Sequence, residues 1–271
     1  MTEEGRPLIV IPVGGVGDRF QYSIEEERRN RRSRFSPELL DALEILPKPL
    51  LPVGEAPLID LILGVFQNQG YTDFLLLTGH QGAEIKKHFK TRDPKGVNIS
   101  FLDTKGKTVV TTLIENSHLM GDRFIHSFGD TLTDSDLEIL RNSHTTQGNE
   151  ASFCTTRTGF HSFTGVALIE TAALHPKGAL SNFQLPDGIS SYLRERGTMV
   201  EAADWLYNVN RLETWDMLAR AFKPGSELWD AVNLGWPQYK EQQSQRTAKM
   251  FLSPDDVQRG LNPPTKQRCK T

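Results

Sequence analysis

Short apolar runs alternate with segments of helical periodicity along the first half of the chain. Four runs rich in Leu, Ile, Val and Phe have the length of buried strands, at 8–13, 74–78, 97–102 and 124–128. Between them, apolar residues recur at helical spacing, at 58–69 and 81–89. This alternation predicts an α/β fold, a Rossmann-like three-layer sandwich with a mostly parallel mixed sheet.

The first predicted strand runs directly into a glycine-rich loop. Gly14, Gly15 and Gly17 are followed by Arg19. We expect the glycines to take positive φ and to approach a ligand closely, and their N–H groups to form an anion nest. Arg19 adds a fork of donors suited to phosphate. The loop therefore predicts a nucleotide site, although it matches neither the dinucleotide fingerprint nor the P-loop.

A second block places a lysine between two prolines. Residues 47–53 read Pro-Lys-Pro-Leu-Leu-Pro-Val. The prolines are expected to hold Lys48 in an extended, stiff segment, because proline fixes its own φ and restricts the preceding residue. A stiff segment reduces the entropy that the lysine loses when it binds an anionic substrate.

Carboxylates follow the strand predicted at 124–128. Gly129 and Asp130 come directly after it, and a carboxylate there is well placed to hold Mg²⁺. Asp134 and Asp136 precede a predicted helix at 137–141, and we interpret them as helix caps.

Together, the glycine loop ending in Arg19 and the Pro-Lys-Pro-Leu-Leu-Pro-Val block resemble the sugar-1-phosphate nucleotidyltransferase family from about Leu8 to Asp136. The resemblance implies a GT-A-like fold and transfer of NMP from an NTP to a sugar 1-phosphate. It implies that Gly14, Gly15, Gly17 and Gly129 contact the nucleotide. Asp18, which stands where the family often has Thr or Ser, and Gln81, at a strand end near the expected nucleotide, are further nucleotide-binding candidates; for Gln81 an ordinary helix N-terminal position is the alternative. The resemblance further implies that Arg19 stabilises the β- and γ-phosphates, that Lys48 stabilises the α-phosphate or the acceptor phosphate, and that Asp130 binds Mg²⁺.

The same resemblance implies an acceptor side and a second metal ligand. Asn208 stands where the family has its second metal-binding aspartate, and an amide oxygen there brings no charge. The family's Glu-Lys-Pro segment is missing. Arg157 is its cationic substitute, and Thr164 with Gly165 occupies the matching strand. The Thr-rich stretch 107–113 is similar to that of glucose-1-phosphate cytidylyltransferases, which slightly favours CTP over UTP, dTTP and GTP.

Two alternatives to this enzyme stay open. Asn208 and the missing Glu-Lys-Pro segment are also compatible with a catalytically weakened homologue that binds nucleotide sugar and regulates a partner. The shortened acceptor region is compatible with a nucleotidyltransferase that acts on a non-sugar phosphate or phosphonate.

Composition limits the remaining classes of function. The chain has 271 residues, a net charge of −3 and two cysteines. We therefore expect a cytoplasmic protein without a disulfide framework, and no nucleic-acid or membrane partner. We expect a core at 1–222 and a C-terminal helical extension and tail at 223–271, through which the chain could form a homo-oligomer. Part of 21–46 is interpreted as an insertion, carrying either a solvated surface helix or an arginine-bearing lid.

Overall fold

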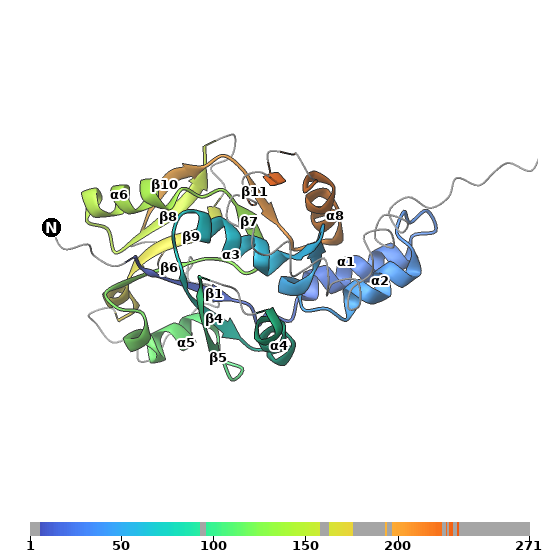
Figure 1. Ribbon diagram of the computed structural model, residues 1–271, viewed down its shortest axis with the longest axis horizontal. Helices are drawn as coiled ribbons and strands as arrows, with labels where there is room; N and C mark the ends of the chain where they lie inside the picture. The colour runs from blue at the N-terminus through green and yellow to red at the C-terminus, as the bar shows by residue number, and fades with distance from the viewer. Residues whose placement is uncertain are drawn as a thin grey trace, which may run out of the picture.

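The computed structural model describes residues 6–92, 96–157, 163–175, 193, 197–223, 226, 228, 229 and 232. At its centre lies a seven-stranded sheet with the order β10-β8-β9-β6-β1-β4-β5 (Figure 1). Its strands are β1 (Leu8–Pro12), β4 (Asp73–Thr78), β5 (Asn98–Asp103), β6 (Arg123–His126), β8 (Ala151–Thr156), β9 (Phe163–Glu170) and β10 (Gly197–Ala203). All neighbours are parallel except at β9, which is antiparallel to β6 and β8. The predicted mostly parallel mixed sheet is confirmed.

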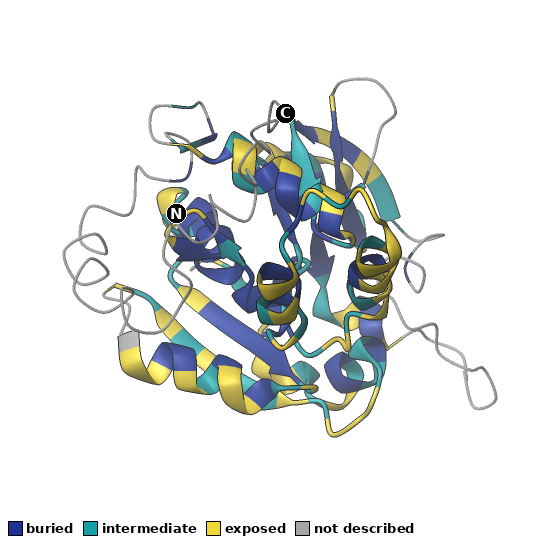
Figure 2. Cartoon of the chain, turned by 90° about the vertical axis from the view of Figure 1, so that its right-hand side faces the viewer, coloured by how far each residue is buried: buried dark blue, intermediate teal, exposed yellow. Residues whose placement is uncertain are grey.

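Helices cover both faces of the sheet because its strands are apolar on both sides. Ile9 and Ile11 of β1 point into one hydrophobic cluster, and Val10 points into the other. The first cluster takes residues from α3 (Leu58–Asn68), α4 (Gly82–Arg92), α6 (Leu137–Gln147) and α8 (Leu212–Ala221). The second takes residues from α5 (Val109–Glu115) and the short helix η3 (Thr171–Leu174). Figure 2 shows the buried strands between helices whose outer faces are exposed, which gives the predicted three layers.

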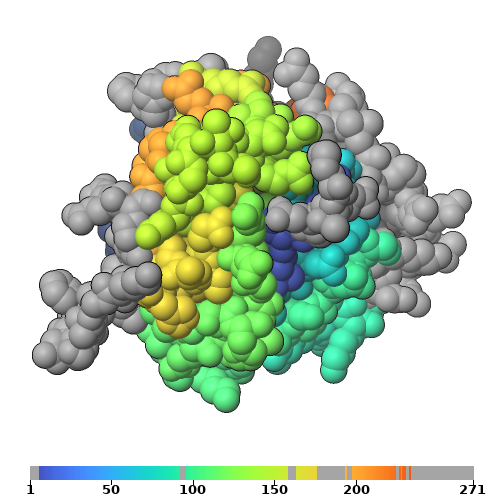
Figure 3. Space-filling model, turned by 90° about the vertical axis from the view of Figure 1, so that its left-hand side faces the viewer, coloured from blue at the N-terminus to red at the C-terminus, as the bar shows by residue number. Residues whose placement is uncertain are grey.

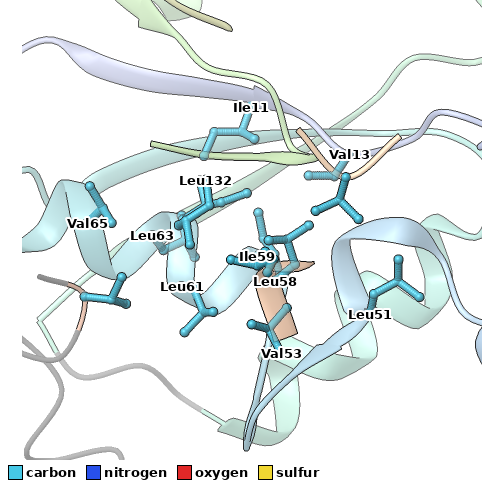
Figure 4. Close-up of a cluster of buried hydrophobic side chains, with 14 of the residues drawn as sticks. Ile11, Val13, Leu51, Val53, Leu58, Ile59, Leu61, Leu63, Val65 and Leu132 are labelled. Carbon is cyan, nitrogen blue, oxygen red and sulfur yellow. The ribbon is translucent and has the colours of Figure 1, made fainter. Parts of the chain in front are cut away.

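The helix α3 forms the centre of the larger cluster. Every residue from Leu58 to Phe66 is buried, and Gly70 follows the helix at φ 79°. Its side chains pack with Ile11, Leu51 and Leu132 (Figure 4). Two short antiparallel ribbons flank this helix, β2 (Pro52–Val53) with β3 (Ala56–Pro57) and β7 (Thr131–Thr133) with β11 (Leu206–Asn208).

The predicted insertion folds as two helices rather than one. They are α1 (Asp18–Arg29) and α2 (Pro37–Glu44), beside the end of the sheet at which β1 finishes (Figure 1). A guanidinium nitrogen of Arg28 in α1 lies 2.5 Å from the carboxylate of Asp41 and 2.6 Å from that of Glu44, both in α2. Ser36 caps α2 by accepting a hydrogen bond from the backbone of Leu39.

A buried carboxylate joins this insertion to α8. Asp216 is 1% exposed and accepts hydrogen bonds from Nε of Arg220 at 2.8 and 2.9 Å. Nη2 of Arg34, which follows α1, lies 2.5 Å from the same carboxylate. Two half-exposed guanidinium groups therefore neutralise one buried charge and hold the insertion against the body.

The two aspartates predicted as caps have different roles. Asp136 caps α6, since its Oδ1 accepts hydrogen bonds from the backbones of Glu138 and Ile139. Asp134 does not cap this helix. Its Oδ1 accepts hydrogen bonds from the backbones of Asp204 and Trp205, so it joins the end of β7 to the start of β11.

The extension predicted from residue 223 lies largely outside the described residues. Of the residues described there, Leu228 and Val232 belong to the larger core cluster, and the ring of Trp229 lies 4.9 Å from that of Phe222. Within the part of the chain that the structure describes, no helix has the length and apolar character needed to span a membrane.

Candidate nucleotide-transfer site

Three glycine-containing loops meet where β1, β4 and β6 end. The backbone N–H of His80 donates to the carbonyl of Gly14 at 3.0 Å. A Cβ on Gly14 would lie 2.1 Å from the backbone nitrogen of Gly79, and one on Gly129 would lie 2.4 Å from the carbonyl oxygen of Pro12. Only glycine permits these approaches. The loops lie at the switch point of the sheet, where open α/β folds bind ligands.

The glycines of the first loop serve different purposes from those predicted. Only Gly17 has a positive φ, at 81°, so the expectation of positive φ at all three is wrong. Gly14 is required by the close approach of protein backbone, whereas Gly15 has no neighbouring atom within 4 Å of a Cβ. Gly15 therefore leaves the backbone of the loop open on its outer side.

The loop continues directly into a helix. Gly17 is the N-cap of α1, and no side chain caps its first N–H groups. Free N–H groups and the helix dipole make such an end favourable for phosphate. Asp18 and Arg19 are exposed in the first turn, and neither side chain makes a hydrogen bond or ion pair with the residues that the structure describes.

The side chain of Lys48 lies against the glycine loop, since a Cβ on Gly17 would be 3.5 Å from its Cγ. Its segment is a 3₁₀ turn, η1 (Lys48–Leu50), so the predicted extended conformation is wrong. The ammonium group lies 2.7 Å from Oδ2 of Asp130 and 2.8 Å from Oδ1 of Asn210. The lysine and aspartate side chains are 13% and 24% exposed. Lys48 and Asp130, predicted separately for the site, are therefore in direct contact.

Asn210 was not among the predicted site residues. It lies just beyond β11, and its side-chain amide donates to Oδ1 of Asn208 while its oxygen accepts from Lys48. A continuous set of polar contacts thus runs from Asn208 through Asn210 and Lys48 to Asp130. No strand periodicity could have identified it, because Asn210 lies beyond β11 and its backbone N–H turns back to the carbonyl of Asn208.

The donor set restricts how a metal ion could be held. Oxygens of Asp130 and Asn208 lie on adjoining elements, since the N–H of Val209 donates to the carbonyl of Asp130. No group of three or more His, Cys, Asp or Glu side chains with metal-binding geometry occurs among the described residues. One carboxylate with amide oxygens fits Mg²⁺, which in nucleotide sites takes one or two carboxylates and completes its shell with phosphates and water.

The predicted acceptor residues differ in their exposure and in the contacts they make. Nη1 of Arg157 is 3.4 Å from Oδ2 of Asp204, and both side chains are exposed. Thr164 is buried, donates to the carbonyl of Cys154 and accepts from Ser135. Its hydroxyl is therefore committed inside the protein.

Gly165 shapes the sheet beside the site. It has φ 86°, and a Cβ there would lie 2.5 Å from the ring of Phe128. Glycine is needed at this position for both reasons. Gly165 accepts a backbone hydrogen bond from Phe128, two residues before Asp130, and so fixes the segment that delivers the carboxylate.

Gln81 lies at the start of α4 with a positive φ of 52°. Its side-chain amide donates to the carbonyl of Ile45 at 3.2 Å, which joins the exit of the insertion to the loop after β4. The Thr-rich stretch forms α5, capped by Thr108, whose hydroxyl accepts from the backbone of Thr111. The roles of these residues in base recognition stay predictions.

A buried imidazole lies in the strand that leads to Asp130. Burial lowers the pKa of His126 to about 4, and a backbone hydrogen bond with Gly165 opposes this shift. Its Nδ1 is fully buried without a hydrogen-bond partner. His126 is therefore neutral at physiological pH and brings no charge to the site.

The chain is similar in sequence to known proteins over part of its length, and no family model matches it. It is 27% identical over 129 residues to a probable glucose-1-phosphate cytidylyltransferase of Bacillus subtilis, covering 40% of this chain and 51% of that protein. It is 24% identical over 123 residues to a UTP–glucose-1-phosphate uridylyltransferase of Synechocystis, covering 41% of this chain and 32% of that protein. The matches thus span about half or less of these curated relatives.

The fold extends further than the sequence similarity. A UDP-glucose pyrophosphorylase from Acinetobacter baumanii superposes with a TM-score of 0.57 at 13% identity, covering 91% of this chain and all of that structure. Such a likeness shows the fold, and it is GT-A-like. The chain is therefore related in sequence, over about two fifths of its length, to sugar-1-phosphate nucleotidyltransferases and has the fold of that family.

Proposed function

We propose that this chain transfers a nucleoside monophosphate from an NTP to a sugar 1-phosphate and releases pyrophosphate. The observation that carries the proposal is the contact of Lys48 with Asp130 beneath the glycine loop. It brings a cation for phosphate and a carboxylate for Mg²⁺ within 2.7 Å of each other, at the sheet edge where α1 begins without a side-chain cap. The cytidylyl- and uridylyltransferase relatives support the same class of reaction.

The chemistry needs positioning and charge stabilisation more than a base. A phosphate oxygen of the acceptor attacks the α-phosphorus, the bond from that phosphorus to the bridging oxygen breaks, and pyrophosphate leaves with the electron pair. The N–H groups of the loop and of α1 bind the triphosphate, and Arg19 neutralises charge on the leaving pyrophosphate. Bound Mg²⁺ would supply further neutralisation of the phosphates, with Asp130 and Asn208 holding it.

In the proposed reaction, Lys48 pairs first with Asp130 and then with a phosphate of the substrates. In the protein alone its ammonium group neutralises Asp130. A divalent ion bound at Asp130 would neutralise this carboxylate in place of the lysine. Lys48, which also donates to Asn210, would then be available to the α-phosphate or the acceptor phosphate. The lysine therefore keeps a partly buried carboxylate paired before substrate binds and stabilises the transition state afterwards.

The test is pyrophosphate release with each NTP and a panel of sugar 1-phosphates, with CTP and glucose 1-phosphate as the favoured pair. We expect Lys48→Met and Asp130→Asn to lower turnover by at least about 100-fold, the cost of losing one preorganised charge. Lys90→Met, at an exposed position near the end of α4, is the matched control for Lys48→Met and should keep full activity. Turnover that survives Asp130→Asn would show that this carboxylate does not hold the metal.

A nucleotide-binding protein without turnover is the second candidate. The oxygen of Asn208 already accepts from Asn210, and Thr164 is buried, so both the second metal ligand and the acceptor side are weak. Binding of CTP with Mg²⁺ but no pyrophosphate from any pair would favour this candidate. Asn208→Asp adds the missing charge and should tighten Mg²⁺ binding in the presence of CTP by about tenfold, measured by calorimetry.

A further inference from the structure

A pocket of about 390 Å³ lies at the opposite end of β7 from the nucleotide-transfer site. Asp130 directly precedes β7, whereas Asp134 directly follows it and lines the pocket. Arg6, just before β1, lines it as well. Figure 3 views this end of the molecule and shows α6 in yellow-green above the dark blue start of β1. The pocket therefore belongs to neither the glycine loop nor the Lys48–Asp130 contact.

The walls of the pocket are held in place by bonds that do not depend on a ligand. Gln69 at the end of α3 donates to the carbonyl of Ser135 and accepts from the N–H of Leu137, which fixes the start of α6 against α3. Asp136 caps α6, and Asp134 accepts from the backbone at the start of β11. Pockets with such preformed walls bind ligands without the cost of ordering them.

Several polar groups face the pocket with bonding capacity to spare. Tyr71 is buried, and its ring lies under the guanidinium of Arg6, 5.3 Å from the ring centre. Among the described residues, Arg141 and Glu138 make no hydrogen bond or ion pair through their side chains. Trp205 adds an aromatic surface and an indole N–H.

The charges around the pocket decide which ligand they suit. Arg6 and Arg141 bring two positive charges, while Asp134, Asp136 and Glu138 bring three negative charges. An anion would be attracted by two groups and repelled by three, and a cation would meet the reverse. Arginine only donates hydrogen bonds and a carboxylate only accepts them, whereas each hydroxyl group of a polyol does both.

We propose that this pocket is a second binding site, for a neutral, hydroxyl-rich ligand of saccharide size. Its hydroxyls bond to the guanidinium of Arg141 and to the free carboxylate of Glu138, and the apolar face of its ring packs on Trp205. A neutral ligand satisfies both kinds of charged group without leaving a charge unpaired. The proposal does not rest on the transfer reaction, because none of these side chains takes part in it.

Saturation-transfer NMR on the full chain tests the site, with glucose and maltose as the probes. We expect saturation transfer to at least one of them, persisting when CTP and Mg²⁺ are added and in Lys48→Met. Arg141→Gln should weaken binding by about tenfold or more, since it removes charged hydrogen bonds. Arg31→Gln, in the exposed turn after α1, should leave binding unchanged.

Three outcomes would overturn the proposal: no signal from either sugar, a signal abolished by CTP or by Lys48→Met, or a signal that Arg141→Gln leaves intact. Chemical-shift mapping with inorganic phosphate covers the rival chemistry. Shifts at Arg6 and Arg141 with phosphate, but not with the sugars, would identify an anion site instead. Glu138→Gln, at the exposed carboxylate to which the proposal assigns the ligand's hydroxyls, provides a second variant if Arg141→Gln is poorly folded, and sugar binding that it leaves intact would count against the site.

Discussion

The neutral imidazole of His126 makes the stability of this protein depend on pH in a defined window. The ring lies fully buried in β6, against Phe128, and its Nδ1 has no partner. Burial lowers its pKa from 6.5 to about 4 in the folded chain. Between these two values the unfolded chain therefore binds a proton that the folded chain does not.

The sign and size of the effect follow from this difference. The contribution of His126 to stability is complete above pH 6.5 and is lost progressively as the pH falls to about 4. A difference of about 2.5 pKa units corresponds to about 3 kcal/mol. Below that pH the folded chain is protonated as well, and no further loss from this group is expected.

His126→Phe measures the pH-dependent contribution of the imidazole to stability. The substitution keeps an aromatic ring against Phe128 and removes both the titration and the unpaired Nδ1. The free energy of unfolding of wild type and variant is measured in urea between pH 6.5 and about 4. As the pH falls, the wild type should lose about 3 kcal/mol of stability relative to His126→Phe. His118→Phe, which replaces an exposed ring in the short helix η2 (Ser117–Leu119), should show no such shift. A difference between wild type and His126→Phe that stays constant with pH would refute the reasoning.

Two further predictions concern stability and are tested by unfolding. In thermal melts, Gly14→Ala should destabilise the fold by about 2 kcal/mol or more, because its Cβ would lie 2.1 Å from the backbone of Gly79. Gly15→Ala has open space around its Cβ and should change stability by less than about 0.5 kcal/mol. Removing Arg34 and Arg220 together should cost about 3 kcal/mol in urea unfolding, because it leaves the buried carboxylate of Asp216 unpaired. Asp216→Ala should cost less, since the two arginines are half-exposed and return to water. Equal costs would contradict the view that the unpaired buried carboxylate, and not the lost ion pairs, sets the loss of stability.

The local pattern of the sequence determined the elements and the edge at which the site lies. Apolar runs and helical spacing predicted β1, β4, β5, β6, α3 and α4 within a few residues, because these periodicities reflect burial of one or both faces. The resemblance to the nucleotidyltransferase family assigned the glycine loop, Lys48 and Asp130 to one site. The structure brings two of these groups, Lys48 and Asp130, into direct contact.

Backbone conformation at proline and glycine was less well determined. Lys48 lies in a 3₁₀ turn, although the flanking prolines predicted an extended segment, because φ near −65° is compatible with both. Gly14 and Gly129 are required by neighbouring strands and not by their own dihedral angles. A sequence shows that a glycine is present, but only the packed structure shows which atom a side chain would strike.

Only the tertiary structure decided which polar groups are joined. Asn210 and Lys48 are 162 residues apart and Arg34 and Asp216 lie on separate elements, so no local spacing links them. The structure also buries the hydroxyl of Thr164, which donates to the carbonyl of Cys154, and places Asp134 in a pocket at the other end of β7 from Asp130. The sequence by itself therefore determined the elements and the chemistry available, since both follow from residue type and periodicity. Partners across long separations depend on how strands are ordered and paired, which is a property of the folded chain.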